Sequence, residues 1–596
     1  MIKTICNIRQ TRRVKVSEYL TNYLQLLVEN LQGPPPEDFR HKEALMHAFG
    51  LLSQHMAYSK EYMANAELMI KQYIFPELTS EIGFMKARAS WVYGEFAHFP
   101  HADEDHLRHA LNALYQCLQS PDLAVRVNAA VSLIKLLDHP AAVEFIRPGL
   151  SHVIRIYLKL IDDIDYDELI ESLKKIVDVF EDEIGPYALD LCQKLSEAFL
   201  RLHEQRKTVE GSGALDLDQE TSLSCEGLMT AIRRILQSIS GKFPEVYPAL
   251  EEILEQPILA TLNDHGTEST DEGLTCLCEL AYNQSAVSQR LWTFYQHIVA
   301  SIMEDRGILD NYLDGSFAFV INLMNKDPNS FKQVTFPNAQ NQPQTALDLT
   351  LMLGQKCFQV ANEKEDEIVA ISVVTLFSSL LENIQGVSEQ VPGIISLLLG
   401  ELQRAQTKEY QLMLLQGVLM CLWYDLGQTV AVLEQQSATE SFFQFIFQKV
   451  GDVKEDFEVK RFILGLSSFL VNSEMPESVK NNYGNIIKAL AFLSARSIEI
   501  RQKEREGKQK EEMAEVEEEG EKLIVEDEED ADIVDLDSED DDAWEMGDDE
   551  DPDGVDSMYD SPLDNIDEVM HLHCQLQNLQ QAGGMELHNF LMQQLG

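Results

Sequence analysis

The 596-residue chain has few residues that break helices, and it lacks the alternation that marks strands. Glycine (30) and proline (19) are both scarce for this length. Apolar residues seldom alternate with polar ones at a period of two, whereas spacings of three and four recur along the whole chain. Because those spacings place apolar side chains on one face of a helix, the sequence predicts an all-α fold.

Cysteine pairs and long apolar runs are also missing. The nine cysteines are scattered without paired spacing, which argues against a disulfide framework and favours reduced thiols in a cytosolic or nuclear protein. The longest apolar stretches, such as that from Leu412 to Tyr424, fall short of the roughly 18 residues that a membrane span needs. Membrane insertion is therefore not expected.

Basic residues are the minority charge. The chain holds 47 Lys and Arg against 100 Asp and Glu, which gives a formal net charge of −53. A field of that sign repels phosphate backbones. Direct nucleic-acid binding is therefore disfavoured, and a basic protein partner is favoured.

Helical hairpins recur at a spacing of about 40 residues. The clearest hairpin runs from Asp105 to Leu137, with a turn in which Asp122 can pair with Arg126. Lys42 and Lys86 occupy equivalent positions 44 residues apart, and Arg126 follows 40 residues after Lys86. Periods of 40 to 44 residues are typical of HEAT and armadillo repeats, whose hairpins stack into a solenoid.

Further along the chain the pattern predicts one more hairpin and two loops. Gly185 and Pro186 stop the helix predicted at 165–182, and Pro186 suits the first turn of the next helix. The two helices are therefore expected to form an antiparallel pair. The stretches 207–220 and 325–344 are rich in turn-forming residues. Both are expected to be surface loops between repeats.

The segment from Glu511 to Asp560 is strongly acidic, and packing of a helical repeat does not explain this composition. It holds 27 acidic residues and a single basic one, Lys522, and so carries about half of the net charge. Such a block repels itself and has little to bury, so it is expected to be disordered. It is either an insertion that keeps the protein soluble or a negatively charged segment that attracts and binds a basic protein.

The second interpretation assigns cargo binding to the densest part of this tract. Its candidate residues are Glu526, Asp527, Glu528, Glu529, Asp530, Glu539, Asp540, Asp541, Asp542, Trp544, Asp548, Asp549, Glu550 and Asp551. Ser538 lies in an acidic context that suits phosphorylation. The expected organisation is a HEAT-repeat solenoid at 1–506, a disordered acidic insertion at 507–561, and terminal helices at 562–596 that close the solenoid.

Motifs for catalysis and metal binding are not found. The chain has no phosphate-binding loop, no nucleophile elbow and no zinc-protease helix. Two histidine groups place possible metal ligands close together in the sequence, namely His101, His106 and His109 beside Asp103 to Asp105, and His571 and His573 beside Cys574. The first fits the acidic start of a helix without metal. We expect no catalytic residue, no metal ligand and no cofactor. Cys276 and Cys278 are expected to lie on different helix faces, one in the core and one at its flank.

The segments FPELTSEIGFMKARASWVYGEF (75–96) and KEALMHAFGLL (42–52) resemble the middle repeats of the importin-beta superfamily, and most closely the importin-seven and importin-eight branch. PDLAVRVNAAVSLIKLL (121–137), VKRFILGLSSFL (459–470), the acidic insertion and the resumption at 561–564 support this resemblance. It covers essentially the whole chain.

The resemblance implies a right-handed superhelical HEAT solenoid that acts as a nuclear import receptor. Such receptors carry basic cargo such as ribosomal proteins and histones, bind phenylalanine-glycine nucleoporins, shuttle between cytoplasm and nucleus, and release cargo to Ran-GTP. The family's N-terminal lobe, which binds Ran, has no counterpart before Met1, so the resemblance implies a C-terminal portion and assigns no Ran contact. The alternative is a HEAT-repeat scaffold or an acidic chaperone for histones or ribosomal proteins, without transport activity.

Overall fold

The protein folds into two compact units, Met1–Asn283 and Gln284–Gly596, and the regular structure of their described residues is helical except for one short strand pair. The computed structural model describes residues 39–56, 66–99, 101, 103–164, 166–210, 215–263, 269–304, 312–337, 342–470, 475–521 and 560–581. This architecture confirms the all-α prediction. Within those ranges, none of the helices combines the length and the apolar character that crossing a bilayer requires.

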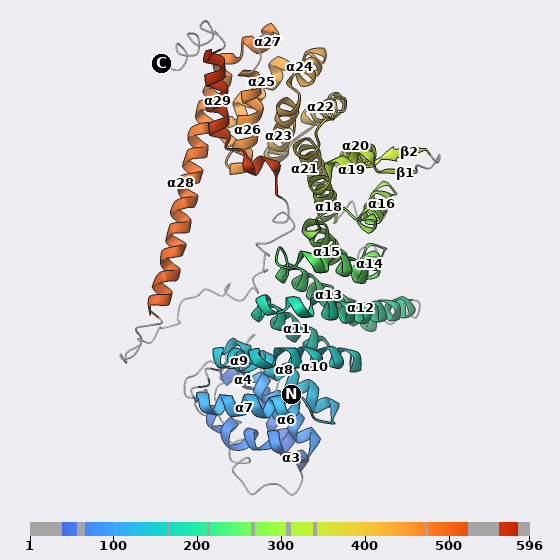
Figure 1. Cartoon of the computed structure of the whole chain (residues 1–596), viewed down its shortest axis with the longest axis vertical. Coiled ribbons are helices and arrows are strands. Elements are labelled where there is room, and N and C mark those ends of the chain that lie inside the picture. Colours follow the sequence, from blue (N-terminus) through green and yellow to red (C-terminus); the bar gives the residue numbers. More distant parts are fainter. Residues whose placement is uncertain are drawn as a thin grey trace, which may run out of the picture. The chain divides into compact units, whose positions relative to one another are not determined.

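The first unit is built from two rows of helices (Figure 1). In one row each helix packs against the next: α3 (Phe39–Gly50), α6 (Gly83–Glu95), α8 (Leu123–Lys135), α11 (Asp167–Val179), α13 (Leu215–Ser238) and α15 (Ser269–Asn283). The other row contains α7 (Glu104–Cys117), α9 (Pro140–Ile146), α10 (Leu150–Asp163), α12 (Ala188–Glu210) and α14 (Tyr247–Asn263). Short elements connect them: α4 (Ser53–Met56), η1 (Ile70–Ile74), η2 (Phe75–Thr79), η3 (Leu136–Asp138), η4 (Arg147–Gly149), η5 (Glu181–Glu183), η6 (Gly185–Tyr187) and η7 (Pro244–Val246).

The repeat predicted from the sequence is confirmed in the first unit. The segments aligned on Lys42, Lys86 and Arg126 form α3, α6 and α8, which are consecutive in one row. Each hairpin joins one helix from each row, and α7 with α8 is the example expected at 105–137. The two rows close on an apolar core, because their facing side chains, such as Leu111 and Leu133, have no solvent exposure.

Polar contacts fix the ends of these hairpins, although one pairing differs from the prediction. The carboxylate of Asp122 caps α8 by accepting a hydrogen bond from the Ala124 amide at 3.0 Å. Arg126 instead pairs with Asp163, at the end of α10, at 3.2 Å. The expected pair between Asp122 and Arg126 is wrong, because each side chain satisfies a helix end.

The two helices on either side of Gly185 and Pro186 do not form the antiparallel pair expected from the sequence. α11 packs against α10 and α13, whereas α12 packs against α13, α10 and α14. The turn at Gly185–Tyr187 therefore connects one repeat to the next rather than closing a hairpin. Local sequence marks the turn well, but the apolar faces decide which helices pair.

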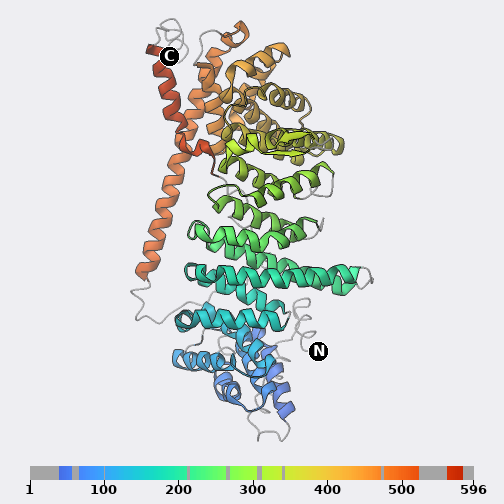
Figure 2. The ribbon, with the colours of Figure 1, turned by 45° about the vertical axis from the view of Figure 1, so that its right-hand side comes forward.

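The second unit repeats the two-row arrangement (Figure 2). One row contains α18 (Leu313–Lys326), α21 (Glu367–Asn383), α23 (Lys408–Tyr424), α26 (Asp456–Ser467) and α28 (Tyr483–Glu521), each packed on the next. The other elements are α16 (Gln289–Met303), α19 (Pro328–Gln333), α20 (Ala346–Lys364), α22 (Val391–Leu402), α24 (Leu426–Gln435), α25 (Thr439–Lys449), η8 (Val450–Asp452), η9 (Ser468–Leu470), α27 (Glu477–Lys480), η11 (Pro562–Asn565) and α29 (Glu568–Gln581).

The two predicted loops contain regular structure. At 325–344 the chain forms α19 and the antiparallel pair of β1 (Thr335–Pro337) and β2 (Pro343–Thr345), with Phe336 opposite Gln344. At 207–220 the described backbone is helical, as the end of α12 and the start of α13. At 325–344, helix α19 packs on α18 and α20, and this packing outweighs the turn-forming composition.

Helix α28 passes the boundary at which the acidic insertion was expected to begin. It continues through residues 507–521, where Glu, Lys, Arg, Met and Ala are good helix formers. Among the preceding residues, Lys503 pairs with Glu499 at 2.9 Å, a spacing that supports a helix. The domain boundaries otherwise stay predictions.

Among the described residues, none of the eight cysteines forms a disulfide, and seven of the eight are buried. Cys276 and Cys278 are both fully buried in α15, so the expectation that one lies at the flank of the core is wrong. The reason is that α15 packs against both α13 and α14, which covers two of its faces.

Candidate functional site

The cargo-binding residues proposed from the sequence lie outside the described part of the chain. This holds for all the acidic residues named between 526 and 551, and for Trp544 and Ser538. Their assignment stays a prediction. The structure does show how the chain is held after the tract, where Asp560 is described again.

Residues 560–581 form a segment, here called the strap, that packs on the row formed by α21, α23, α26 and α28. The strap consists of η11 and α29; η11 contacts α21, and α29 contacts α26 and η9. Leu563 and Leu572 are its buried apolar residues, with 5% and 7% exposure. The strap therefore fixes one end of the acidic tract to the second unit.

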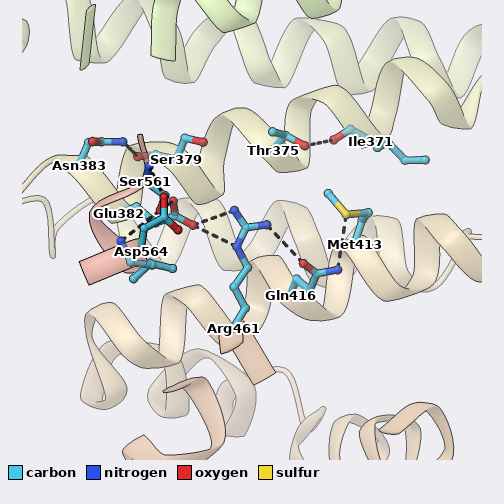
Figure 3. Close-up of polar contacts among 11 residues, drawn as sticks. Ile371, Thr375, Ser379, Glu382, Asn383, Met413, Gln416, Arg461, Ser561 and Asp564 are labelled. Carbon is cyan, nitrogen blue, oxygen red and sulfur yellow. Dashed lines mark hydrogen bonds and ion pairs between the residues drawn. The ribbon is translucent and has the colours of Figure 1, made fainter. Parts of the chain in front are cut away.

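The first anchor of the strap is a buried carboxylate that pairs with an arginine and a serine (Figure 3). Glu382 of α21 has no side-chain exposure and pairs with Arg461 of α26, 2.9 Å from Nη2 to Oε1. The Ser561 hydroxyl donates to Oε2 of Glu382 at 2.9 Å. Arg461 also donates to Gln416 of α23 at 3.3 Å, so three helices and the strap meet at this point.

The backbone of the strap is held beside this first anchor. Asn325 donates to the Asp560 carbonyl at 2.8 Å, and Lys460 donates to the Leu563 carbonyl at 3.2 Å. Ser561 and Asp564 form a capping box. The Ser561 side chain accepts a hydrogen bond from the Asp564 backbone, and the Asp564 side chain accepts one from the Ser561 backbone. Burial lowers the pKa of Lys326, and the neighbouring Asp560 carboxylate opposes that shift.

The second anchor also consists of a buried carboxylate, an arginine and a serine, but here the carboxylate lies on the strap. The strap supplies the buried carboxylate, Glu568, which has no side-chain exposure. Arg501 of α28 donates to both of its oxygens at 2.6 Å, and Ser497 donates to Oε1 at 2.5 Å. Both bonds to Glu568 come from Nη2 of Arg501, and such charge-assisted hydrogen bonds are stronger than neutral ones.

Arg501 also binds Asp567, with 3.0 Å between Nη1 and Oδ2. Burial alone would lower the pKa of Arg501, but Glu568 and Asp567 outweigh it and raise the pKa. The hydrogen bond from the Met570 amide, with help from Arg501, lowers the pKa of Asp567. Both ions are therefore stabilised in their charged forms.

An aromatic contact completes the docking of α29. The rings of Trp423 and His571 meet edge to face, with their centroids 4.9 Å apart. Burial lowers the pKa of His571, which favours its neutral form.

Neither histidine group forms a metal site among the described residues, where no cluster of three or more His, Cys, Asp or Glu side chains has suitable geometry. Asp103 caps α7 by accepting from the His106 amide, and His106 lies 3.1 Å from the Tyr93 hydroxyl. His573 lies 2.7 Å from Gln577 on α29.

The two anchors are not predicted from the sequence. A weak signal was present for the first, because Gln416 interrupts an apolar run and Ser561-Pro562-Leu563-Asp564 reads as a capping box. Nothing in the local sequence identifies Glu382, Arg501 or Glu568 as partners, since the paired residues are 66 to 179 positions apart.

No family model matches the chain. Among curated proteins, it is 26% identical over 458 residues to a probable importin-7 homolog of Dictyostelium discoideum, covering 74% of the chain and 40% of that protein. It is 23% identical over 516 residues to importin-8 of Danio rerio, covering 82% of the chain and 46% of that protein. The chain therefore spans less than half the length of these relatives.

Solved structures share the fold. The exportin Cse1 in its cargo-free, cytoplasmic state matches with a TM-score of 0.58 at 14% identity, over 83% of this chain and 51% of that one. Kap95p, in a structure with RanGDP, matches with a TM-score of 0.53 at 16% identity, over 80% and 57%. These likenesses support the HEAT-repeat fold. In sequence, the chain resembles the importin-seven and importin-eight branch of the importin-beta superfamily, as its repeats predicted.

Proposed function

We propose that this chain acts in nuclear transport, as an importin-beta-type receptor that binds basic cargo proteins and carries them through the nuclear pore under the control of Ran. The observation that carries this proposal is the similarity to importin-7 and importin-8 relatives over about three quarters of the chain or more. The two rows of repeat helices, which match solved karyopherin folds, are consistent with it.

The acidic tract favours basic proteins, such as ribosomal proteins or histones, as the cargo. Its 50 residues hold 27 acidic side chains, a density that raises the capture rate of a cationic protein. The strap holds the tract on the second unit at Asp560, and helix α28 leads into it from the other side.

The other partners follow from the same proposal. They are Ran-GTP and phenylalanine-glycine nucleoporins, and the protein would move between cytoplasm and nucleus. Catalysis has no place in this function, and the relatives found are transport receptors rather than enzymes.

An acidic scaffold or chaperone for histones or ribosomal proteins is the second candidate. The charge of the tract favours it, because binding of a cationic protein needs no pore passage. The two functions differ in whether the chain recognises the pore and the GTPase.

A binding experiment separates the two candidates. The full chain is immobilised and exposed to Ran loaded with GTP, Ran loaded with GDP, phenylalanine-glycine repeats, and the same repeats with serine in place of phenylalanine. Transport predicts binding of Ran-GTP over Ran-GDP and loss of repeat binding with the serine version. Binding of a histone but of neither Ran-GTP nor the repeats would favour the chaperone instead.

A further inference from the structure

Ser561 is the only strap residue in the first anchor, and proline follows it directly. Its hydroxyl accepts a hydrogen bond from the Leu563 amide at 3.2 Å and donates to Glu382 at 2.9 Å. Because Glu382 is fully buried, this hydroxyl is a specific partner that solvent does not replace. The hydrogen bond between η11 and Glu382 therefore depends on the chemical state of one serine.

The surroundings of Ser561 are poorly suited to additional negative charge. Glu382 lies on one side, and the Asp564 carboxylate accepts from the Ser561 amide at 3.0 Å on the other. Arg461 is already committed to Glu382 and Gln416. A phosphoryl group, with a charge near −2, would meet two carboxylates and lose the hydroxyl donor.

We propose that Ser561 is a phosphorylation site for protein kinases that require proline directly after the acceptor serine, and that its phosphorylation releases the strap from α21 and α26. In this step the Ser561 oxygen attacks the γ-phosphorus of ATP and forms the new P–O bond. The bond from that phosphorus to ADP breaks, and the hydroxyl proton passes to the general base of the kinase. The products are phosphoserine and ADP.

The docked strap also explains when the reaction can occur. Ser561 caps η11, and its hydroxyl is engaged with Glu382, so a kinase that binds an extended segment must wait for the strap to open. Phosphorylation would then trap the open state and expose the face of α21 and α26 around Glu382 and Arg461.

The test uses the purified full chain, ATP and a proline-directed kinase, with the modified residue identified by mass spectrometry. Hydrogen exchange of the amides in α29 reports opening of the strap. We expect incorporation at Ser561, and exchange in α29 that is faster by about 100-fold, because the phosphoryl charge repels the Glu382 and Asp564 carboxylates and the hydroxyl donor is lost. Ser561→Ala should abolish incorporation at position 561 and speed exchange by only about 5-fold, since Arg461 still satisfies Glu382.

Two further variants control for the motif and for opening. Pro562→Ala should remove recognition by this class of kinase. Arg501→Ala, which weakens the second anchor, should speed phosphorylation of Ser561 by about 10-fold or more, because the strap opens more often. The proposal is overturned if the kinase does not modify Ser561 even in the Arg501→Ala chain. It is equally overturned if phosphoserine leaves exchange in α29 unchanged or slows it, which would mean that Lys460 or Lys326 accommodates the phosphate.

Discussion

At the scale of single residues, two buried carboxylates decide how the strap is held. Glu382 and Glu568 have no exposed side-chain surface, and each is paired with an arginine and a serine. A buried charge is tolerated only when its partners satisfy it, and in each group the arginine supplies the counter-charge. The polar groups orient the strap, and burial of Leu563 and Leu572 adds apolar stabilisation.

Replacing Glu382 by glutamine removes the charge and keeps the shape. Arg461, whose side chain is only 12% exposed, would then lack its counter-charge. We expect Glu382→Gln to lower the free energy of unfolding of the second unit by about 2 to 4 kcal/mol, measured by urea denaturation. Lys503→Ala, which breaks an exposed pair in α28, is the matched control and should cause no measurable change. Equal stability of the two variants would contradict the role given to the buried pair.

The buried carboxyl group of Glu279 should make the stability of the first unit depend on pH. Burial raises its pKa to about 7 from an ordinary 4.5, while a hydrogen bond from Asn283 at 3.0 Å partly opposes the shift. The folded chain thus binds this proton more tightly than the unfolded chain does. The stabilisation is complete below about pH 4.5 and is lost as the pH rises to about 7.

The variant Glu279→Gln removes that proton equilibrium. The neutral amide keeps an acceptor for Asn283, so the variant should exceed the natural chain in stability by about 3 kcal/mol at pH 8. The two should differ little near pH 4.5. Hydrogen exchange of α13 and α15, followed from pH 4.5 to 8, measures this difference. A constant difference across that range would show that Glu279 does not titrate as stated.

At the scale of elements, close contact between neighbouring helices sets the spacing of each row. Gly465 of α26 faces α23, where an added Cβ atom would lie 2.6 Å from Cβ of Leu419 and 2.7 Å from its carbonyl oxygen. Because the obstacle includes backbone, it cannot move aside like the end of a flexible side chain. The contact between α23 and α26, which also positions Arg461, depends on this glycine.

A pair of glycine variants tests this contact. Gly465→Ala should lower the free energy of unfolding of the second unit by about 1 to 3 kcal/mol through overpacking. Gly400→Ala, at a position in α22 with no atom within 4 Å of the added Cβ, should raise it by about 0.5 to 1 kcal/mol through higher helix propensity. Urea denaturation of the two chains gives both values. Opposite signs are expected, and a harmless Gly465→Ala would contradict the close approach.

At the scale of the whole molecule, the dominant property is the concentration of negative charge in one segment. The residues 522–559 alone contain 19 acidic side chains. The chain on both sides of this segment is helical, at α28 and at the strap. The tract can therefore be replaced without removing either attachment.

Replacing 522–559 by a Gly/Ser linker of equal length should weaken binding of a histone or a ribosomal protein by about 10-fold or more at low salt, and it should flatten the salt dependence. A scrambled tract of the same composition is the control, and it should retain the affinity if charge density is what matters. Binding is measured by titration at several salt concentrations. Unchanged affinity of the linker version at low salt would reduce the tract to a solubility device.

The sequence by itself determined the helical class, the repeat length near 40 residues and the likeness to importins. These properties rest on local periodicity, which every hairpin repeats, and on motifs such as that at 75–96. It also located the acidic tract, because charge density needs no structure to be read. It assigned the wrong helices to the hairpin at Gly185, since a turn signal does not state which apolar faces meet.

Only the tertiary structure decided how the strap is anchored. Glu382, Arg461 and Ser561 are far apart in the chain, and each belongs to a helix or turn whose local pattern is complete without the others. Their contact follows from the order in which α21, α23 and α26 pack, and a charged residue on a helix gives no local sign of whether it will be buried. Stacking of the repeats brings these side chains together, and long-range packing therefore determines the anchor.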